Sequence, residues 1–340
     1  MPPSLLGRYR AELEEALRAA IPAGSPALLY SMMRYHLGWE DEQGRLLLGC
    51  GGKGLRPSLC LWACEAVGGH RHQALPAAVA LELLHNFSLV HDDVQDGDTE
   101  RRHRPTVWSV WGQPQAINAG NSLLILARLA MMRLEERGVS PAKVIEACRV
   151  LDNACLIMTE GQCLDIGFES ESQVSVEAYL EMALKKTGAL LAASLCLGAL
   201  VGSNEDMAGR FGRCGRLLGM AFQIRDDILG VWGSAQVTGK PVAADIRRRK
   251  KSLPVVYALV AAQDEVREEL QRLYSQGSLT NGDVARVVNI LERVGAREYS
   301  QGMAEERIAE ALAELTQAGI VPGAYRDFEE LAAFLLDRDF

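Results

Sequence analysis

Apolar residues recur at three- and four-residue spacing along most of this 340-residue chain. The pattern is clearest at 74–90 (ALPAAVALELLHNFSLV), 144–166 (VIEACRVLDNACLIMTEGQCLDI) and 207–229 (MAGRFGRCGRLLGMAFQIRDDIL). That spacing is the period of an α-helix, and no segment of any length alternates as a β-strand would. No proline interrupts the chain between Pro141 and Pro241, which favours several long helices joined by short turns. The sequence therefore predicts an all-α fold.

Several of these segments are apolar over most of the helix circumference, so the helices must be buried inside a bundle. The chain has no linker-like or low-complexity stretch and no repeat of fixed period. We expect a single domain over residues 1–340, a bundle of ten or more helices. Apolar periodicity does not count cores, so two half-domains remain an alternative. Candidate breaks between helices fall at 49–57, 97–105, 138–141, 170–175 and 237–245.

The composition is that of a soluble globular protein, with 48% hydrophobic and 24% charged residues. The net charge of −8 argues against general nucleic-acid binding, because binding to a phosphate backbone requires a positive face. None of the eight cysteines forms a CxxC pair or stands near a histidine cluster. We therefore expect reduced core thiols rather than a zinc site.

The first twenty residues are amphipathic and include acidic side chains, unlike a secretory signal. No apolar run reaches the roughly 18 residues that span a bilayer. These features predict a cytoplasmic protein with no membrane span.

Two groups of carboxylates interrupt the apolar helical pattern. In HDDVQD, Asp92 and Asp96 share a helix face one turn apart, and Asp93 lies about 100° round the helix. Carboxylates this close raise one another's pKa unless a cation compensates them, and such oxygen ligands suit Mg²⁺. One motif of this kind is equally compatible with a solvated helix end. A second pair, Asp226 and Asp227, also lies in an apolar segment, and two such pairs indicate a cation cluster facing a cavity.

Basic residues that can bind a polyanion occur at several points of the chain. Each alone is more often a surface charge, but beside two metal-type motifs they indicate a site for two diphosphates and several Mg²⁺ ions. They are Lys53 and Arg56 on a glycine-rich turn, His85 two helical turns before Asp92, Arg101, Arg102, Lys185, Lys186 and the run 247–251.

Seven segments follow one another in the order known from one protein family: GGKGLRP, LLHNFSLVHDDVQD, RRHRPT, EGQCLD, KKTGAL, FQIRDDILG and GKPVAADIRRRKKSLP. From about Gly51 to Pro254 the chain resembles the trans-isoprenyl diphosphate synthases, the polyprenyl synthetase family. The resemblance implies a deep central cavity, three Mg²⁺ ions and a homodimer. It also implies the head-to-tail condensation of isopentenyl diphosphate with an allylic prenyl diphosphate.

The resemblance assigns roles to the residues at matching positions. The ligands of Mg²⁺ would be Asp92, Asp96 and Asp226. The allylic diphosphate would be bound by Arg101, Lys186 and Lys250. Isopentenyl diphosphate would be bound by Lys53, Arg56, His85 and Arg102. The polar residues lining the reacting centre would be Thr187 and Gln223. Supporting roles would fall to Asp93, Asp227, Gln162 and Asp245.

The sequence departs from the family pattern at four positions. Gly230 stands where the second acidic motif commonly ends in aspartate, so we expect Asp226 to act with one carboxylate fewer and Mg²⁺ dependence to change. His103 replaces a common glycine, Asn121 a frequent aspartate, and Ser252 the usual threonine. None of these changes removes a primary ligand.

Product length in this family depends on residues just before the first acidic motif. Phe87 and Ser88 lie five and four positions before Asp92, and Phe87 is roughly 7.5 Å away along a helix axis. One bulky residue beside a small one resembles the pattern of twenty-carbon (geranylgeranyl) producers, and DDVQD lacks the two-residue insertion of the common bacterial farnesyl type. The predicted product is geranylgeranyl diphosphate. Farnesyl diphosphate and longer products are alternatives, and Phe87 is otherwise a core residue.

Three other functions compete with this interpretation. A class I terpene cyclase would carry an Asn/Ser/Glu metal motif in place of DDILG and would need no isopentenyl diphosphate site. A regulatory subunit of a heteromeric prenyl synthase typically loses one or both aspartate motifs, and Gly230 keeps that alternative open. The RRRKK run would otherwise be a nucleic-acid or membrane patch, but its place after the second acidic motif favours phosphate capture.

Overall fold

The structure is a computed structural model, and it describes residues 3–22, 24, 26–47, 52, 54–171, 173–202, 205–233 and 243–337. Lys53 lies outside these ranges, as do residues 239–242 of the GKPVAAD segment. The chain is 78% helical, and the predicted all-α class with ten or more helices is confirmed. Within the described ranges, β-structure is limited to an isolated bridge and a hairpin of two two-residue strands.

The chain divides into two compact units, which we describe separately. Unit one comprises Met1–Asn153, Ala193–Gly212 and Ala318–Asp327, and unit two comprises Ala154–Ala192, Arg213–Gln317 and Phe328–Phe340. A single domain over the whole chain stays a prediction.

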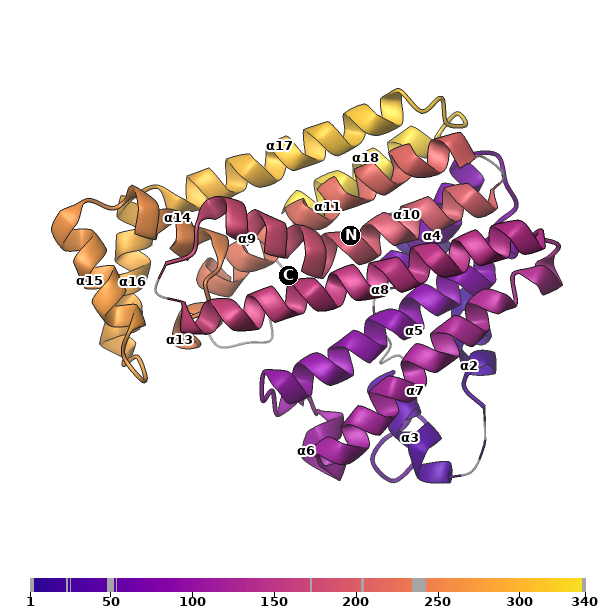
Figure 1. Ribbon diagram of the computed structural model, residues 1–340, viewed down its shortest axis with the longest axis horizontal. Coiled ribbons are helices and arrows are strands. Elements are labelled where there is room, and N and C mark those ends of the chain that lie inside the picture. The colour runs from indigo at the N-terminus through magenta and orange to yellow at the C-terminus, as the bar shows by residue number, and fades with distance from the viewer. Residues whose placement is uncertain are drawn as a thin grey trace. The chain divides into compact units, whose positions relative to one another are not determined.

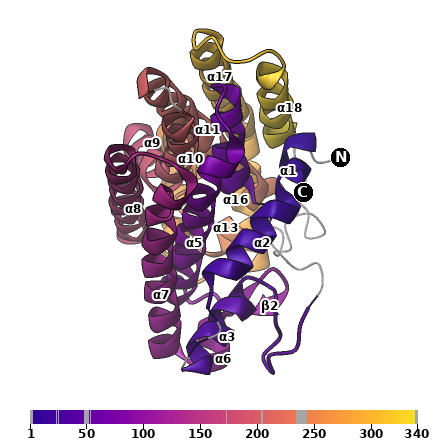
Figure 2. The same ribbon diagram turned by 90° about the vertical axis from the view of Figure 1, so that its right-hand side faces the viewer.

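Unit one is built around the long helix α5, whose buried residues include many alanines. Helices α5 and α7 lie side by side (Figures 1 and 2). Small residues of α7, Ala116, Ala119 and Gly120, are buried and allow this close packing. The complete helices of this unit are α1 (Ser4–Arg8), α2 (Arg10–Ala20), α3 (Ala27–His36), α4 (Leu55–Ala66), α5 (Arg71–Gln95), α6 (Val107–Trp111), α7 (Gln113–Met132) and the 3₁₀ turn η1 (Glu135–Arg137). Helices shared with unit two are α8 (Pro141–Ser170), α10 (Ala189–Val201), α11 (Glu205–Trp232) and α18 (Ala324–Asp337).

The end of α5 and the hairpin after it place the first acidic motif and its arginines. Gly97, at φ 66°, stops the helix just after Asp96. Strands β1 (Glu100–Arg101) and β2 (Arg104–Pro105) then pair antiparallel across a two-residue turn. Both turn residues, Arg102 and His103, have positive φ (51° and 60°), as a type I′ hairpin turn requires. A left-handed backbone at His103 explains physically why a glycine suits this position.

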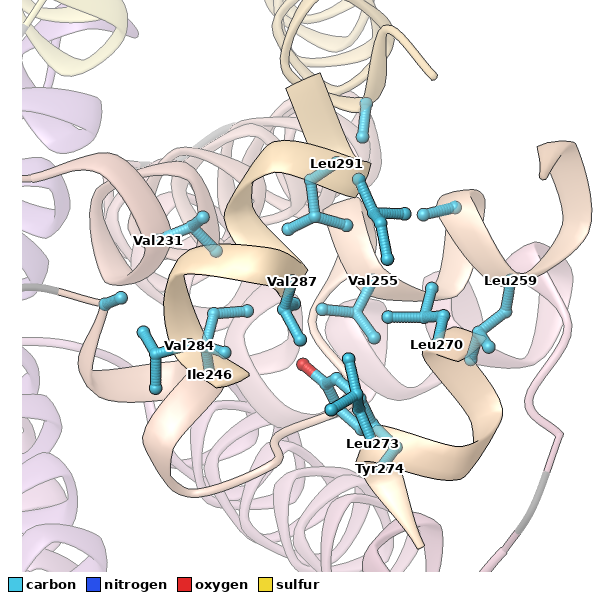
Figure 3. Packing of buried hydrophobic residues seen from close by; sticks show 14 residues of the cluster. Val231, Ile246, Val255, Leu259, Leu270, Leu273, Tyr274, Val284, Val287 and Leu291 are labelled. Carbon is cyan, nitrogen blue, oxygen red and sulfur yellow. The ribbon is translucent and has the colours of Figure 1, made fainter. Parts of the chain in front are cut away.

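Unit two contains a second apolar core that supports the segment after α11. Val231 of α11, Ile246 of α13, Val255 of α14, Leu273 of α15 and Val287 of α16 meet in this core (Figure 3). The complete elements of this unit are α9 (Val176–Ala183), the π-helical turn η2 (Leu184–Gly188), α13 (Ala244–Arg247), α14 (Leu253–Ala261), α15 (Asp264–Tyr274), α16 (Asn281–Arg293) and α17 (Ala296–Thr316).

The π-helical turn η2 carries Lys186 and Thr187, two residues predicted for the site. Helix α8 passes so close that a Cβ atom added to Gly161 would lie 2.2 Å from the backbone nitrogen of Lys186. Gly161 belongs to the EGQCLD motif, so this glycine allows the close approach of α8 to η2. Single π-turns inside helices are frequent at functional sites.

Two helical stretches, Arg71–Gln95 and Val176–Val201, are long and apolar enough to cross a bilayer by length and composition alone. In these stretches 72% and 78% of the most apolar window is buried inside the chain, as in core helices. Among the cysteines in the described ranges, Cys60, Cys64 and Cys214 are buried free thiols, whereas Cys163 is exposed. The first three agree with the expectation of core thiols.

Candidate active site

The first acidic motif presents its three aspartates in different environments. Asp92 is partly buried and Asp96 is exposed at the end of α5, whereas Asp93 is fully buried. Asp93 accepts a hydrogen bond from Nε of Arg101 at 2.7 Å, and its Oδ2 has no hydrogen-bond partner among the described residues. Burial raises the pKa of Asp93 to about 6, although Arg101 opposes the shift. The buried carboxylate of Asp93 therefore fixes the position of the Arg101 guanidinium.

Arg101 and Arg102 of the hairpin line a cationic cavity of about 260 Å³ in unit one. Burial lowers the pKa of Arg102, and the nearby carboxylate of Glu82 opposes the shift. A desolvated guanidinium attracts an anion more strongly than an exposed one, so the cavity suits a phosphate group. The remaining lining residues are Tyr35, His36, Gly38, Asp93, Arg104, Pro105, Thr106 and Val107.

Arg56 and His85 also meet in unit one. Nη1 of Arg56 lies 3.2 Å from Nε2 of His85. Burial holds the pKa of His85 well below its usual value, and Arg56 and Arg102 add to the effect. The imidazole is therefore neutral, and its Nε2 accepts a hydrogen bond from Arg56. Lys53, the fourth residue predicted to bind isopentenyl diphosphate, lies outside the described residues.

In unit two, Asp227 is the centre of a buried hydrogen-bond network. Its carboxylate accepts hydrogen bonds from Tyr179 Oη (2.6 Å), Gln223 Nε2 (3.0 Å) and the Leu253 backbone N–H (2.9 Å). Gln223 Oε1 in turn accepts a hydrogen bond from the Thr187 hydroxyl at 2.6 Å. Burial raises the pKa of Asp227, with Lys250 opposing it from 3.8 Å. The structure thus joins Thr187, Gln223 and Asp227 in one continuous chain.

Lys186 and Lys250 lie among carboxylates of the same unit. Lys186 donates a hydrogen bond to Asp165. Burial alone would raise the pKa of Asp165, but Lys250 and Lys186 together outweigh burial and lower it. Burial disfavours the charged form of Lys250, but Asp227, Asp245, Asp165 and Asp226 outweigh it and raise its pKa. We call these four aspartates and two lysines the Lys250 cluster. It brings Asp226 of the second acidic motif together with two of the predicted diphosphate ligands.

The basic run 247–251 does not form one continuous patch. Arg247 donates to the Asn281 side chain at 2.9 Å, and Arg249 donates to the Gln276 carbonyl. Lys251 lies over the Tyr274 ring, 4.8 Å from its centroid. Contacts with α15, α16 and the turn between them therefore spread these side chains, while Lys250 faces the acidic cluster.

The space beside Gly230 is filled by another carboxylate. A Cβ atom added to Gly230 would lie 2.1 Å from Oδ2 of Asp245. Asp245 comes from the first turn of α13, which follows a left-handed residue, Ala243, at φ 56°. Asp245 thus occupies the space that a side chain at position 230 would fill.

The carboxylates fit Mg²⁺ only as part of a larger ligand set. Among the described residues, no three His, Cys, Asp or Glu side chains gather closely enough to hold an ion by themselves. Mg²⁺ normally takes one or two protein carboxylates and completes its shell with water and substrate phosphates. Asp92 with Asp96, and Asp226 with Asp245 nearby, offer donors of this type. The family to which these motifs point uses Mg²⁺.

The two residues predicted to limit product length lie on adjacent faces of α5. The Phe87 ring is partly buried and packs edge-on against His91, with ring centroids 4.7 Å apart. The Ser88 hydroxyl donates to the His85 carbonyl of its own helix at 2.8 Å. Ser88 is therefore satisfied internally and presents a small surface.

The structure also assembles charged residues that the sequence analysis left without a role. Asp165 stands in the EGQCLD motif, but nothing in that motif indicates that its partner is Lys186. Glu82 lies in the apolar first part of α5, away from the first acidic motif, and burial raises its pKa. No local pattern marks Tyr179 or His36, because their partners are distant in the sequence.

Comparison with known proteins agrees with these motifs. Residues 39–291 match the polyprenyl synthetase family. A (2E,6E)-farnesyl diphosphate synthase of Mycobacterium tuberculosis is 39% identical, over 90% of this chain and 85% of its own length. A geranylgeranyl diphosphate synthase of the same organism is 41% identical, over 93% of this chain and 89% of its own length. The crystal structure of a polyprenyl synthetase from Streptomyces coelicolor A3(2) superposes with a TM-score of 0.90 at 38% identity, covering 98% of both chains. The chain therefore belongs to the polyprenyl synthetase family.

Proposed function

We propose that this chain condenses isopentenyl diphosphate head to tail with an allylic prenyl diphosphate, using three Mg²⁺ ions, and that its main product is geranylgeranyl diphosphate. The reaction class follows from the family, and the chain is a prenyltransferase. The observation that carries the proposal is the Lys250 cluster, which lies beside the hydrogen-bonded chain from Thr187 to Asp227.

In this proposal the lysines of unit two and Arg101 bind the allylic diphosphate. Asp165 holds Lys186, and Asp227 lies near Lys250, so both ammonium groups are positioned before the substrate arrives. Preorganised charges stabilise a leaving group without reorganisation during the reaction. Asp92, Asp96 and Asp226 would hold Mg²⁺, which would supply charge neutralisation for the diphosphate.

Thr187 and Gln223 would face the reacting carbons. The Thr187 hydroxyl donates its hydrogen to Gln223, so the lone pairs of the Thr187 oxygen are oriented by that bond. An oxygen fixed in this way stabilises the allylic carbocation that forms when the C–O bond to diphosphate breaks. The double bond of isopentenyl diphosphate then attacks this carbon, a C–C bond forms, and the product cation loses a proton.

Arg56, His85 and Arg102, with Lys53, would bind isopentenyl diphosphate in unit one. The contact with neutral His85 fixes the Arg56 guanidinium. Burial of Arg102 favours an anionic partner, because a charge out of water interacts more strongly with its counter-charge. Both features support a diphosphate-binding role.

Family membership does not determine product length, because relatives of similar identity include farnesyl and geranylgeranyl synthases. Phe87 as a single bulky side chain beside Ser88 supports the twenty-carbon product. Growth of the prenyl chain would stop where its end meets the Phe87 ring.

The proposal includes a homodimer in the cytoplasm. Helix α7 exposes Ile117, Ile125, Leu129 and Met132, with 43 to 60% of each residue exposed. Ile145 of α8 is 56% exposed, and Arg128 and Asp152 join α7 to α8 by an ion pair. Large apolar residues gathered on neighbouring helices are typical of a surface that another chain covers.

A product assay tests the reaction. The purified protein is incubated with labelled isopentenyl diphosphate and each of the five-, ten- and fifteen-carbon allylic starters, with Mg²⁺ or with EDTA. The dephosphorylated alcohols are then sized by mass spectrometry. We expect a twenty-carbon alcohol that EDTA abolishes, and no activity in Asp92→Ala despite an unchanged far-UV circular dichroism spectrum.

Each alternative has its own outcome in this assay. A fifteen-carbon or longer alcohol would keep the reaction and reject Phe87 as the limit. Cyclic hydrocarbon from an allylic diphosphate alone would indicate a terpene cyclase. No elongation from any starter would reject the proposal and favour a subunit that needs a partner. Full activity in Asp92→Ala would reject the role given to Asp92 at the metal site.

A further inference from the structure

We infer that His91 and Gly120 fix the position of the Phe87 ring, and that this three-residue stack sets the length of the product. The inference rests on the proposed function, because it concerns the chain-length limit of that reaction. It assigns a positioning role to His91, which directly precedes the aspartates of the first acidic motif.

The first observation is the contact between the two rings on α5. Phe87 and His91 are four residues apart, so they lie one turn apart on the same face of the helix. Their ring centroids are 4.7 Å apart and their planes meet at 64°, an edge-to-face arrangement. Such a contact favours one ring orientation over others. His91 therefore limits where the Phe87 ring can move.

The second observation is the contact between His91 and α7. A Cβ atom added to Gly120 would lie 2.3 Å from both Cδ2 and Nε2 of His91. That distance is about 1 Å or more inside ordinary van der Waals contact, so no larger residue fits without moving the imidazole. Nε2 of His91 also lies 3.4 Å from the Ile117 carbonyl oxygen. The imidazole is thus held between the backbone of α7 and the Phe87 ring.

These contacts form a stack of backbone, imidazole and phenyl ring across the α5–α7 pair. Phe87 cannot retreat toward α7 while His91 fills that space. Removing the imidazole would open room of ring size directly behind Phe87. Adding a methyl group at Gly120 would press the imidazole toward Phe87 and make the stack more rigid.

The stack is tested by product length, a readout that a merely slower or less stable enzyme does not shift. Products of the wild type, Phe87→Ala, His91→Ala, the double variant and Gly120→Ala are compared at equal substrate conversion. Gly167→Ala on α8 is the matched control for a helical glycine, because a Cβ atom there meets nothing within 4 Å. Thermal melts identify any variant that fails to fold.

We expect Phe87→Ala and His91→Ala each to lengthen the main product by at least one five-carbon unit. The double variant should go no further than Phe87→Ala, because His91 acts through the phenyl ring. Gly120→Ala should give no product longer than the wild type, and Gly167→Ala should match the wild type. If Phe87→Ala lengthens the product and His91→Ala does not, the positioning role is wrong and the proposed limit stands. If neither variant changes product length, the Phe87 limit and the positioning role of His91 are both wrong.

Discussion

Replacing Asp226 and replacing its neighbour Asp227 should have different effects, although the two side chains are chemically identical. Asp227 is fully buried and accepts hydrogen bonds from Tyr179, Gln223 and the Leu253 backbone, whereas Asp226 is partly buried within the Lys250 cluster. We predict that Asp227→Ala destabilises the fold. Asp226→Ala should leave the fold intact and abolish turnover.

The structure sets the size of the difference. Asp227→Ala leaves a phenol, a side-chain amide and a backbone N–H buried without their acceptor, and it removes the nearby counter-charge of Lys250. Removing one partner of a buried charged network typically costs about 3–5 kcal/mol. In a protein of this size that loss corresponds to a fall in melting temperature of up to about 10 °C. Asp226 is partly exposed, so its interactions in the cluster are screened by water, and we expect Asp226→Ala to change stability by about 1 kcal/mol or less.

The assay combines urea unfolding, followed by circular dichroism, with turnover under saturating Mg²⁺. The two variants are compared with each other as well as with the wild type, because they differ only in position. If Asp227→Ala unfolds at the same urea concentration as the wild type, the network does not stabilise the fold and our reasoning is wrong. If Asp226→Ala keeps full turnover, the second motif does not act as proposed.

Two further predictions concern single side chains. Gly230→Ala should displace the Asp245 carboxylate. It should raise the Mg²⁺ concentration needed for half-maximal turnover several-fold, with little change in melting temperature. Identical Mg²⁺ titrations of variant and wild type would contradict this prediction. His36 should make the fold acid-sensitive, because burial, and to a smaller extent Arg102, lower the pKa of its imidazole to about 3. Below the ordinary pKa of histidine, the folded state therefore binds fewer protons than the unfolded state. Its stabilising contribution is complete above the ordinary histidine pKa and falls by about 2 kcal/mol by pH 5, so His36→Gln should flatten the loss of urea stability between pH 7 and pH 5. An equal loss in wild type and variant would show that His36 does not cause it.

The motifs that were predictable from the sequence are those whose residues lie within one or two helical turns. The spacing of Asp92, Asp93 and Asp96 predicts that Asp93 faces a different direction, and the structure buries it against Arg101. The period of apolar residues likewise predicts the all-α class. Both depend on local geometry, which the sequence determines directly.

Pairings across long stretches of chain were not predictable in the same way. Gly230 predicts that Asp226 acts with one carboxylate fewer. The structure brings Asp245, to which the family resemblance gave a supporting role, into the space beside Gly230. Nothing in the intervening residues specifies that approach, because it depends on how α13 packs in the core shown in Figure 3. The partnership of Lys186 with Asp165 depends in the same way on a π-helical turn that apolar periodicity does not reveal.

The charge balance of the Lys250 cluster explains why a metal ion would be needed for diphosphate to bind there. The cluster holds four aspartates, Asp165, Asp226, Asp227 and Asp245, but only two lysines, Lys186 and Lys250. Asp165 binds one lysine and Asp227 lies beside the other, so a bare diphosphate would meet a cluster with excess negative charge. Divalent cations bound there would reverse that sign, and the lysines would remain positioned for the diphosphate oxygens. Without a cation, these carboxylates would repel an anion. With Mg²⁺ they would favour an anion that arrives together with the ion.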